Sequence, residues 1–358
     1  MRNFFRIVSP LLAAIFSWGC ANHDSGSRII AIDWDAAPIP EPEICRVVPL
    51  ETSQESLVGN RFDVRIFDDK IFILEYGKVG IYGMDGSLIN VINKFGRGPQ
   101  EYLMATAMDY CNDTLYIVDG MEHKILKYDI QGNYLGVTPC ENFLGQFVLW
   151  ADRYVAITDG YRDSQCALSA FLPDGRLERG FMPSIEGNMG SWNYDLFRCG
   201  DKLLFRQDNT RTIWEIDRAM NITTHVEFDF GSQWMTPEEI VSQFGEDPDP
   251  YKAKAYTDRQ EKTSSFAFIE SETAMHLNFS LGKQYYGWLY DKKTQTQYLS
   301  KFDTENRQLS TEHIYSFYRD CLVTVIPASR YLEHYADLHP LQIAEDDNPV
   351  LVFYKPAH

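Results

Sequence analysis

The sequence lacks the common signatures of catalysis. It contains no HExxH, GxSxG, GxxxxGK[ST] or GxGxxG segment, which removes the usual evidence for a zinc protease, an α/β-hydrolase, a P-loop enzyme or a dinucleotide-binding enzyme. One close histidine pair, His334 and His339, is five residues apart and therefore off a shared helical face. From the sequence we predict no catalytic residues, no metal site and no cofactor.

Positive charge is also scarce. The chain has 33 Lys and Arg against 51 Asp and Glu, which gives a formal net charge of −18. Such a chain repels polyanions, so neither nucleic acid nor an anionic membrane surface is expected as a partner. Acidity on this scale otherwise favours solubility.

Cysteine pairs at short spacing are missing. Six cysteines follow Cys20, and none of them forms a CxxC motif, so neither a zinc site nor a redox motif is indicated. Six cysteines allow fifteen complete pairings. The sequence therefore leaves both disulfides and buried free thiols open.

Long apolar runs are absent beyond the first twenty residues. Those residues combine Arg2 and Arg6 with a short apolar stretch and a small residue before Cys20, which is typical of a secretory signal. The junction is similar to the lipobox of bacterial lipoproteins, although Ser17 stands where Leu is usual. We predict a signal peptide over 1–19, lipidation at Cys20 and a tether over 20–27. The alternative is a plain signal peptide with an incidental cysteine.

A repeat runs through the rest of the chain. Three segments, at 78–92, 124–138 and 166–180, each alternate apolar and polar residues on both sides of a turn containing Gly86, Gly132 or Gly175. Glycine supplies the positive φ that tight hairpin turns need. A fourth copy has Met220 in place of the glycine, so we expect its turn to differ.

Each hairpin follows another alternating pair of segments, which makes four short strands per roughly 45 residues, the signature of a propeller blade. We predict that residues 28–358 form one all-β domain, a six-bladed β-propeller of four-stranded blades. Helical insertions are expected near 236–262 and 328–342. A strand from within 28–50 should close the ring by pairing near 350–354, because closure removes an exposed edge.

The stretch "FGRGPQEYL", residues 95–103, leads from the first blade to the second and should lie at the mouth of the channel. Its glycines and proline suit a crossing between blades. Arg97, Glu101 and Tyr102 are candidate ligand contacts; the alternative is that Arg97 pairs with Glu101 or Asp119 and that Tyr102 is core. Other candidates on the same face are His123, Tyr161, Arg162, Trp192, Tyr194 and Arg211.

Acidic residues end the second strand of four blades. They are Glu75, Asp119, Asp159 and Asp208. They could form a carboxylate ring that binds a cation, but turn capping is the favoured explanation, because Asp commonly hydrogen-bonds the backbone two residues on.

Three segments carry a family resemblance. "FGRGPQEYL", "VVPLETSQESLVG" (47–59) and "EDDNPVLVFYK" (345–355) resemble, in order and spacing, a family of six-bladed β-propeller lipoproteins of Gram-negative bacteria, similar in architecture to NHL and TolB-like propellers. The resemblance covers nearly the whole mature chain. It implies an exported lipoprotein of the cell envelope, at the outer membrane and facing the periplasm or the surface. It implies no activity.

Two functions remain open. We favour a non-catalytic binding or scaffold module that binds a glycan, peptide or protein at the channel mouth and touches the membrane only through its anchor. The alternative is a propeller enzyme, a lyase or hydrolase, whose Asp, His, Arg and Tyr come from loops far apart in sequence.

Overall fold

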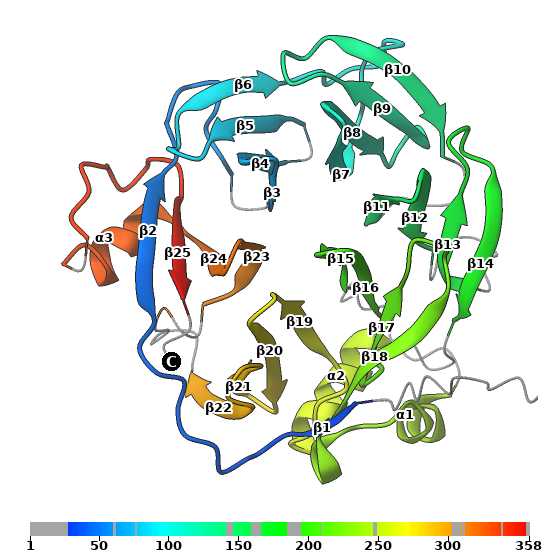
Figure 1. Cartoon of the computed structure of the whole chain (residues 1–358), viewed down its shortest axis with the longest axis vertical. Helices are drawn as coiled ribbons and strands as arrows, with labels where there is room; N and C mark the ends of the chain where they lie inside the picture. Colours follow the sequence, from blue (N-terminus) through cyan, green and yellow to red (C-terminus); the bar gives the residue numbers. More distant parts are fainter. Residues whose placement is uncertain are drawn as a thin grey trace, which may run out of the picture.

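The chain forms a ring of six β-sheets around a central channel (Figure 1). This computed structural model describes residues 28–355 except 60–61, 76, 141–145, 159–165, 185–194, 208, 246–248, 303–308, 310–311 and 338. Each sheet contains four antiparallel strands, and one sheet carries a fifth strand. In five of the sheets the four strands follow sequence order from the centre of the ring outward. The predicted six-bladed propeller is therefore confirmed.

The blades follow one another along the chain. Blade 1 contains β3 (Asp63–Phe67), β4 (Lys70–Leu74), β5 (Val79–Gly83) and β6 (Leu88–Ile92). Blade 2 contains β7 (Ala105–Cys111), β8 (Thr114–Asp119), β9 (Lys124–Tyr128) and β10 (Tyr134–Pro139). Blade 3 contains β11 (Phe147–Trp150), β12 (Arg153–Ile157), β13 (Cys166–Phe171) and β14 (Leu177–Pro183). Blade 4 contains β15 (Asp195–Cys199), β16 (Lys202–Arg206), β17 (Thr212–Ile216) and β18 (Ile222–Asp229). Blade 5 contains β19 (Phe266–Glu270), β20 (Ala274–Leu281), β21 (Gln284–Asp291) and β22 (Thr296–Phe302).

Blade 6 is completed by the N-terminal region. It contains β23 (Ile314–Tyr318), β24 (Cys321–Ile326) and β25 (Val350–Lys355), and its outer strand is β2 (Glu43–Pro49). β2 pairs with β25 from Glu43 opposite Lys355 to Pro49 opposite Val350, which confirms the predicted closure. Figure 1 shows β2 beside β25, although the two strands lie at opposite ends of the sequence.

The same N-terminal region covers two further blades, which the sequence did not reveal. β1 (Ile29–Ala31) adds a parallel fifth strand to β18 of blade 4. Trp34 then packs against Phe230, Phe279 and Tyr286, and the Leu299 N–H of blade 5 donates to the Ala37 carbonyl at 2.9 Å. Residues 28–49 therefore form an N-terminal strap over the outer edges of blades 4, 5 and 6.

Helices interrupt the strands where the sequence predicted them. A 3-10 turn, η1 (Gly231–Gln233), and helices α1 (Pro237–Phe244) and α2 (Pro250–Arg259) lie between blades 4 and 5, and α3 (Ala328–His334) lies within blade 6. Thr236 caps α1 by accepting from the Glu239 N–H, and the Glu239 side chain accepts from the Thr236 N–H, which completes a capping box. No helix in the described part of the chain is long and apolar enough to cross a membrane.

The turns between third and fourth strands share one backbone conformation. Gly86, Gly132 and Gly175 have φ of 85°, 81° and 87°. Met220 has φ of 66°, and its N–H donates to the carbonyl three residues earlier, as in the glycine turns. The expectation that this turn differs is wrong, because the Asn221 N–H and side chain both bind the Asp217 carboxylate and hold the same turn without glycine.

The two faces of the ring carry different connections. The turns from first to second and from third to fourth strand lie on one face, which we call the tight-turn face. The crossings between blades and the turns from second to third strand lie on the other, the mouth face. The mouth face carries α1, α2, α3, residues 50–59 and the stretch 95–103.

Candidate functional site

The stretch 95–103 mainly has a structural role in the crossing from blade 1 to blade 2. The Glu101 carboxylate accepts from the Gly98 N–H at 2.7 Å, and a Cβ on Gly96 would come within 2.1 Å of it. Glu101 thus closes the turn that its glycines permit. Arg97 is exposed and makes no hydrogen bond or ion pair within the described residues, so the alternative that it pairs with Glu101 or Asp119 is not observed.

Tyr102 lies in the core. It is 0% exposed, its hydroxyl donates to the Ile92 carbonyl at 2.9 Å, and burial raises the pKa of its phenol to about 12. The expectation that Tyr102 contacts a ligand is wrong, because its ring is buried in the core that blades 1 and 2 share. The alternative, a core residue, is correct, although Tyr102 lies in the crossing before β7 and not in the inner strand itself.

The remaining predicted residues are not brought together. His123 is half-buried in the turn between β8 and β9, and Arg211 forms ion pairs with Glu227 and Asp229 at the outer edge of blade 4. Tyr161, Arg162, Trp192, Tyr194 and Cys20 lie outside the described residues.

The acids at the ends of second strands serve their turns where they are described. Asp119 is fully buried and accepts from the backbone N–H groups of Leu103, Met121 and Glu122. Glu75 accepts from the Gly59 N–H at 2.7 Å and pairs with Lys78. Asp159 and Asp208 lie outside the described residues. For Asp119, these bonds agree with turn capping.

A pocket of about 700 Å³ opens on the mouth face where blades 6, 1 and 2 meet. Its walls come from residues 58–59 and 62–63, the ends of β4 and β24, the start of β7, the start of α3, and residues 345–347 and 349. The apolar lining residues are Val58, Phe62, Leu74, Ala105, Tyr315, Val325, Pro327, Ala328 and Pro349; the acidic ones are Asp63, Glu75, Glu345, Asp346 and Asp347. We call this the mouth pocket.

An aromatic pair forms one wall of the mouth pocket. The rings of Phe62 and Tyr315 stack with centroids 6.0 Å apart and an interplanar angle of 20°, and His313 meets Tyr315 edge-on at 4.6 Å. Phe62 comes from the strand entering blade 1 and Tyr315 from β23, so closure of the ring creates the pair. Stacked rings offer a flat apolar surface with a negative face.

The carboxylates of the pocket differ in how they are neutralised. Asp63 pairs with Arg65 at 2.9 Å, and Asp347 accepts from the Ala344 N–H at 2.7 Å. Glu345 and Asp346 are exposed and have no partner among the described residues. No Lys or Arg appears among the described lining residues. The pocket therefore offers a negative potential beside an aromatic surface, which suits a positively charged group.

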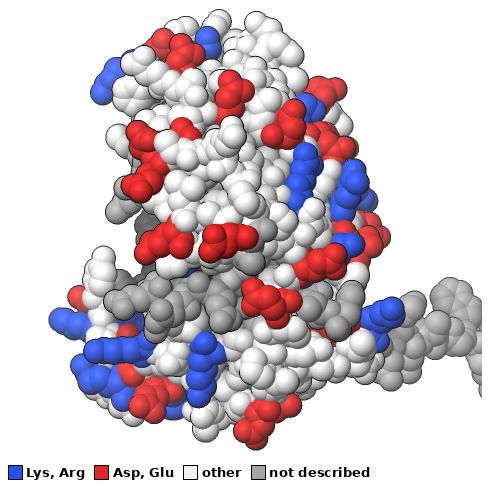
Figure 2. Space-filling view, turned by 90° about the vertical axis from the view of Figure 1, so that its left-hand side faces the viewer, with Lys and Arg blue, Asp and Glu red and all other residues white. Residues whose placement is uncertain are grey.

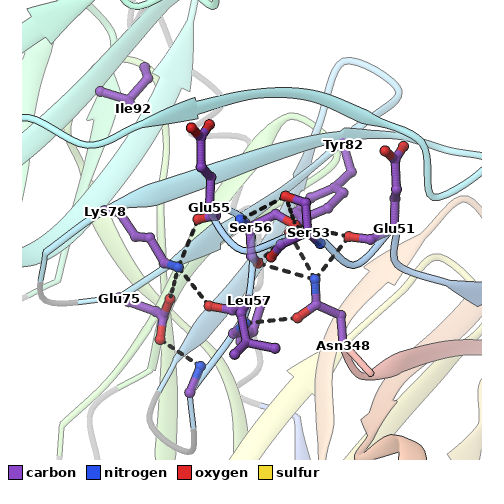
Figure 3. Close-up of polar contacts among 12 residues, drawn as sticks. Glu51, Ser53, Glu55, Ser56, Leu57, Glu75, Lys78, Tyr82, Ile92 and Asn348 are labelled. Atoms are coloured by element: carbon purple, nitrogen blue, oxygen red, sulfur yellow. Dashed lines mark hydrogen bonds and ion pairs between the residues drawn. The ribbon is translucent and has the colours of Figure 1, made fainter. Parts of the chain in front are cut away.

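The wall formed by residues 50–59 is held by one buried amide. Asn348 is 1% exposed; its Nδ2 donates to the carbonyls of Glu51 and Ser56, and its Oδ1 accepts from the Val58 N–H at 2.8 Å (Figure 3). Lys78 adds bonds to the Glu55 and Leu57 carbonyls. Asn348 and residues 51–59 belong to two of the segments that carried the family resemblance, and the amide joins these two segments in this chain.

We expect Asn348→Ala to lower the free energy of unfolding by about 2–3 kcal/mol, because it leaves the Val58 N–H without its acceptor. It also removes one donor each from the carbonyls of Glu51 and Ser56, which still accept from the Ser56 and Tyr82 hydroxyls. Urea denaturation measures the loss. The matched control is Thr52→Ala, which removes a single bond, from the Asn348 N–H to the exposed Thr52 hydroxyl, and should cost about 1 kcal/mol. Equal losses in the two variants would contradict an anchoring role for the Asn348 amide.

Charged side chains tie the inner strands together along the channel. Arg198 of β15 donates to both oxygens of Asp109 on β7, at 2.9 and 2.5 Å, and Asp109 also accepts from the Leu149 N–H of β11. Asp109 is 2% exposed. Nearer the mouth, burial raises the pKa of Asp195, although Arg206 lies 2.6 Å away and opposes that shift. The contacts of Asp109 join blades 2, 3 and 4.

A close histidine–carboxylate contact exists, but not at the mouth. His225 lies 2.8 Å from Glu270 and 3.2 Å from Glu215, near the tight-turn face between blades 4 and 5. Lys292 binds Glu270 and Lys202 binds Glu215. Burial works to raise the pKa of Glu270, but His225 and Lys292 together hold it below its usual value. Both carboxylates already bind lysines, so the cluster stabilises the contact between the two blades.

Within the described residues no three His, Cys, Asp or Glu side chains are grouped to hold a metal ion.

Sequence reasoning singled out the mouth face but did not identify the residues of the mouth pocket. Phe62, Tyr315 and the acids at 345–347 come from three distant segments, and no local pattern connects them. The acids at 345–347 could have been noticed in the sequence. Three consecutive acids precede the closing strand there, and strand formation does not require them.

Comparisons with known proteins agree with the fold. The model of the family described as "Domain of unknown function (DUF4934)" matches residues 43–355. A crystal structure from Bacteroides fragilis, of a protein named provisionally as exported, is similar with 16% identity and a TM-score of 0.76, covering 92% of this chain and 99% of that one. A DUF4221 family member from Bacteroides vulgatus has 7% identity and a TM-score of 0.53, covering 88% and 98%. No curated protein matches. At these identities the structural likeness shows the fold, and the relation to NHL and TolB-like propellers stays a prediction.

Proposed function

We propose a function on the premise that this chain belongs to the DUF4934 family, whose description assigns none. The chain is a non-catalytic binding module of the cell envelope, and its ligand enters the mouth pocket. The observation that carries this proposal is the pocket itself, about 700 Å³ in volume, with an aromatic pair on one wall and carboxylates around it. That volume lies in the range of pockets that bind small ligands or single side chains.

The chemistry of the pocket favours a cationic peptide or protein segment among the expected glycan, peptide and protein ligands. A Lys or Arg side chain could place its apolar stem against Phe62 and Tyr315 and its charge near Glu345 and Asp346. The exposed Arg97 remains a proposed contact for a larger ligand, outside the pocket. Acidic side chains are spread over the side of the molecule formed by blades 6 and 1 (Figure 2), which would attract such a ligand from solution.

Calorimetric titration with trilysine, triglutamate and a neutral oligosaccharide tests the proposal. We expect only trilysine to bind, with an affinity that falls as salt is added. The double variant Glu345→Gln/Asp346→Asn should weaken binding about threefold to tenfold, because each exposed pair contributes roughly 0.3–0.7 kcal/mol. Both side chains are exposed, so the fold should not change.

The control is Asp201→Asn/Glu272→Gln, which removes the same net charge from exposed positions on the tight-turn face. It should leave trilysine binding within about twofold of wild type. If both double variants weaken binding equally, only net charge matters and the mouth pocket is not the site. Binding of the oligosaccharide alone would replace the cationic ligand with a glycan.

The enzyme alternative, a lyase or hydrolase, is not carried further. It would require paired acid–base groups at the mouth. His225 meets Glu270 and Glu215 between blades 4 and 5, where both carboxylates bind lysines, and on α3 His334 lies 3.4 Å from its exposed neighbour Glu333.

We also propose that Cys20 carries the lipid that holds the module at the outer membrane. The support is the basic start, the apolar stretch and the Gly19–Cys20 junction. Cys20→Ala should move the protein from the membrane fraction to the soluble fraction of the cell envelope, as judged by fractionation and immunoblotting. If the variant sediments with membranes as wild type does, the anchor is elsewhere.

A further inference from the structure

The surface of blade 5 that faces blade 6 contains polar residues where the opposite surface is apolar. On β20, Met275, Leu277 and Phe279 pack into the core shared with blade 4. Because side chains alternate along a strand, His276 and Asn278 point the other way, toward blade 6. His276 is 3% exposed, and its cross-strand neighbour Ile269 packs against the blade 6 core.

Blade 6 supplies a third polar group to the same interface. Leu351 and Phe353 of β25 pack toward blade 1, and Tyr354 points toward blade 5 within a core that also contains Tyr331 and Tyr335. Tyr354 is 2% exposed, and burial raises the pKa of its phenol far above the usual value.

These three side chains each have a buried atom without a partner. His276 Nε2, Asn278 Oδ1 and the Tyr354 hydroxyl make no hydrogen bond to any part of the chain that the structure describes. An unpaired buried donor or acceptor costs roughly 1–3 kcal/mol, and nearly all such groups in folded proteins are bonded to protein or to ordered water. The combined free-energy cost of three such groups at one interface would equal a large fraction of the net stability of a domain.

The strand register provides room beside these atoms. Ala267 of β19 and Gly287 of β21 lie directly opposite Asn278. Both are small and lie on the surface that faces blade 6, so the side chains next to the amide leave space there. Polar walls and a little space are what a buried water needs.

The groups at this interface are neutral or already paired, so they favour an uncharged ligand over an ion. Burial lowers the pKa of His276 to about 3, so its imidazole is uncharged at neutral pH. The nearby Glu312 already pairs with Arg330 at 2.6 Å and accepts from the Tyr335 hydroxyl at 3.2 Å. A cation would find no free carboxylate in this set, whereas water can donate to Asn278 Oδ1 and both donate to and accept from the other two groups.

We propose that the interface between blades 5 and 6 binds ordered water molecules that hydrogen-bond to His276, Asn278 and Tyr354. This site is independent of the mouth pocket and of its ligand. Its effect is to make this interface a hydrated joint, in contrast to the aromatic core between blades 4 and 5 that contains Phe228, Phe266 and Trp288.

The sign of a stability change tests the proposal. If water satisfies the hydroxyl, Tyr354→Phe loses hydrogen bonds and lowers the melting temperature by about 1–3 °C. If the hydroxyl is truly unpaired, the same variant removes a buried unsatisfied group and raises the melting temperature. The ring is retained, so packing does not change.

Tyr331→Phe is the matched control. Tyr331 lies in the same core, is 1% exposed, and donates directly to the His339 carbonyl at 2.7 Å, so its loss must lower the melting temperature. A high-resolution crystal structure of the purified protein gives the second measurement. Water within about 3.2 Å of the Tyr354 hydroxyl and of His276 Nε2 supports the site. Absence of such water, or a melting temperature raised by Tyr354→Phe, overturns it.

Discussion

Deletion of residues 21–50 is expected to abolish the cooperative fold or to leave an aggregated product. The deletion removes β1 and β2, and with them four buried side chains, Ile30, Ile32, Val48 and Leu50. At about 1.5–3 kcal/mol each, their burial contributes roughly 6–12 kcal/mol, which is comparable to the whole stability of a domain. It also exposes the edge of β25, a template for association with other chains. Calorimetry and size-exclusion chromatography measure both effects.

A shorter deletion distinguishes the effect of ring closure by β2 from the effect of covering blades 4 and 5 with β1 and Trp34. Removal of residues 28–38 takes away β1 and Trp34 but keeps β2, whose register with β25 closes the ring. We expect this variant to stay monomeric and to have a melting temperature below that of wild type and above that of the longer deletion. If the long deletion melts within about 2 °C of wild type, the strap does not close the propeller.

Gly175→Ala is expected to lower the free energy of unfolding by about 2–5 kcal/mol. The residue has φ of 87°, which costs an L-residue roughly 1–2 kcal/mol. In addition, its new Cβ would lie 2.0 Å from the Pro139 carbonyl oxygen on the outer strand of blade 2. Main-chain atoms cannot move aside easily, so overpacking adds about 1–3 kcal/mol. Urea denaturation measures the loss.

Gly132→Ala is the matched control, because it has nearly the same backbone conformation with open space beside it. Its φ is 81°, and the nearest atom to a new Cβ is 3.5 Å away. It should cost only about 1–2 kcal/mol. Equal losses at the two positions would show that backbone strain alone matters and that the turn of blade 3 does not press against blade 2.

Gly86 behaves like Gly175, since a Cβ there would lie 2.1 Å from the Pro49 carbonyl oxygen of β2. The glycines that made the repeat visible in the sequence therefore serve two purposes. Each permits a left-handed turn, and two of them also let that turn approach the preceding blade. The second purpose cannot be predicted from a repeat, because it depends on the neighbouring blade.

The stretch 95–103 shows where residue type misleads. Arg97 and Tyr102 were singled out because a turn needs neither a guanidinium nor a phenol. The hydroxyl of Tyr102 instead binds the Ile92 carbonyl across the blade junction, and its ring fills core space. A phenol can be a core residue with one internal bond, and only burial distinguishes that role from ligand binding.

The sequence by itself determined the blade repeat, the count of six, the closing N-terminal strand and the helix that begins at Thr236. These features depend on local physics: alternation along strands, turn residues and caps act over a few residues and leave a readable pattern. Only the tertiary structure decided the mouth pocket and the hydrated joint. Phe62, Tyr315 and Asp346 line one pocket because the ring closes, and His276 and Tyr354 come from two neighbouring blades. Contacts between residues so far apart in the chain arise from the packing of blades, which no local pattern records.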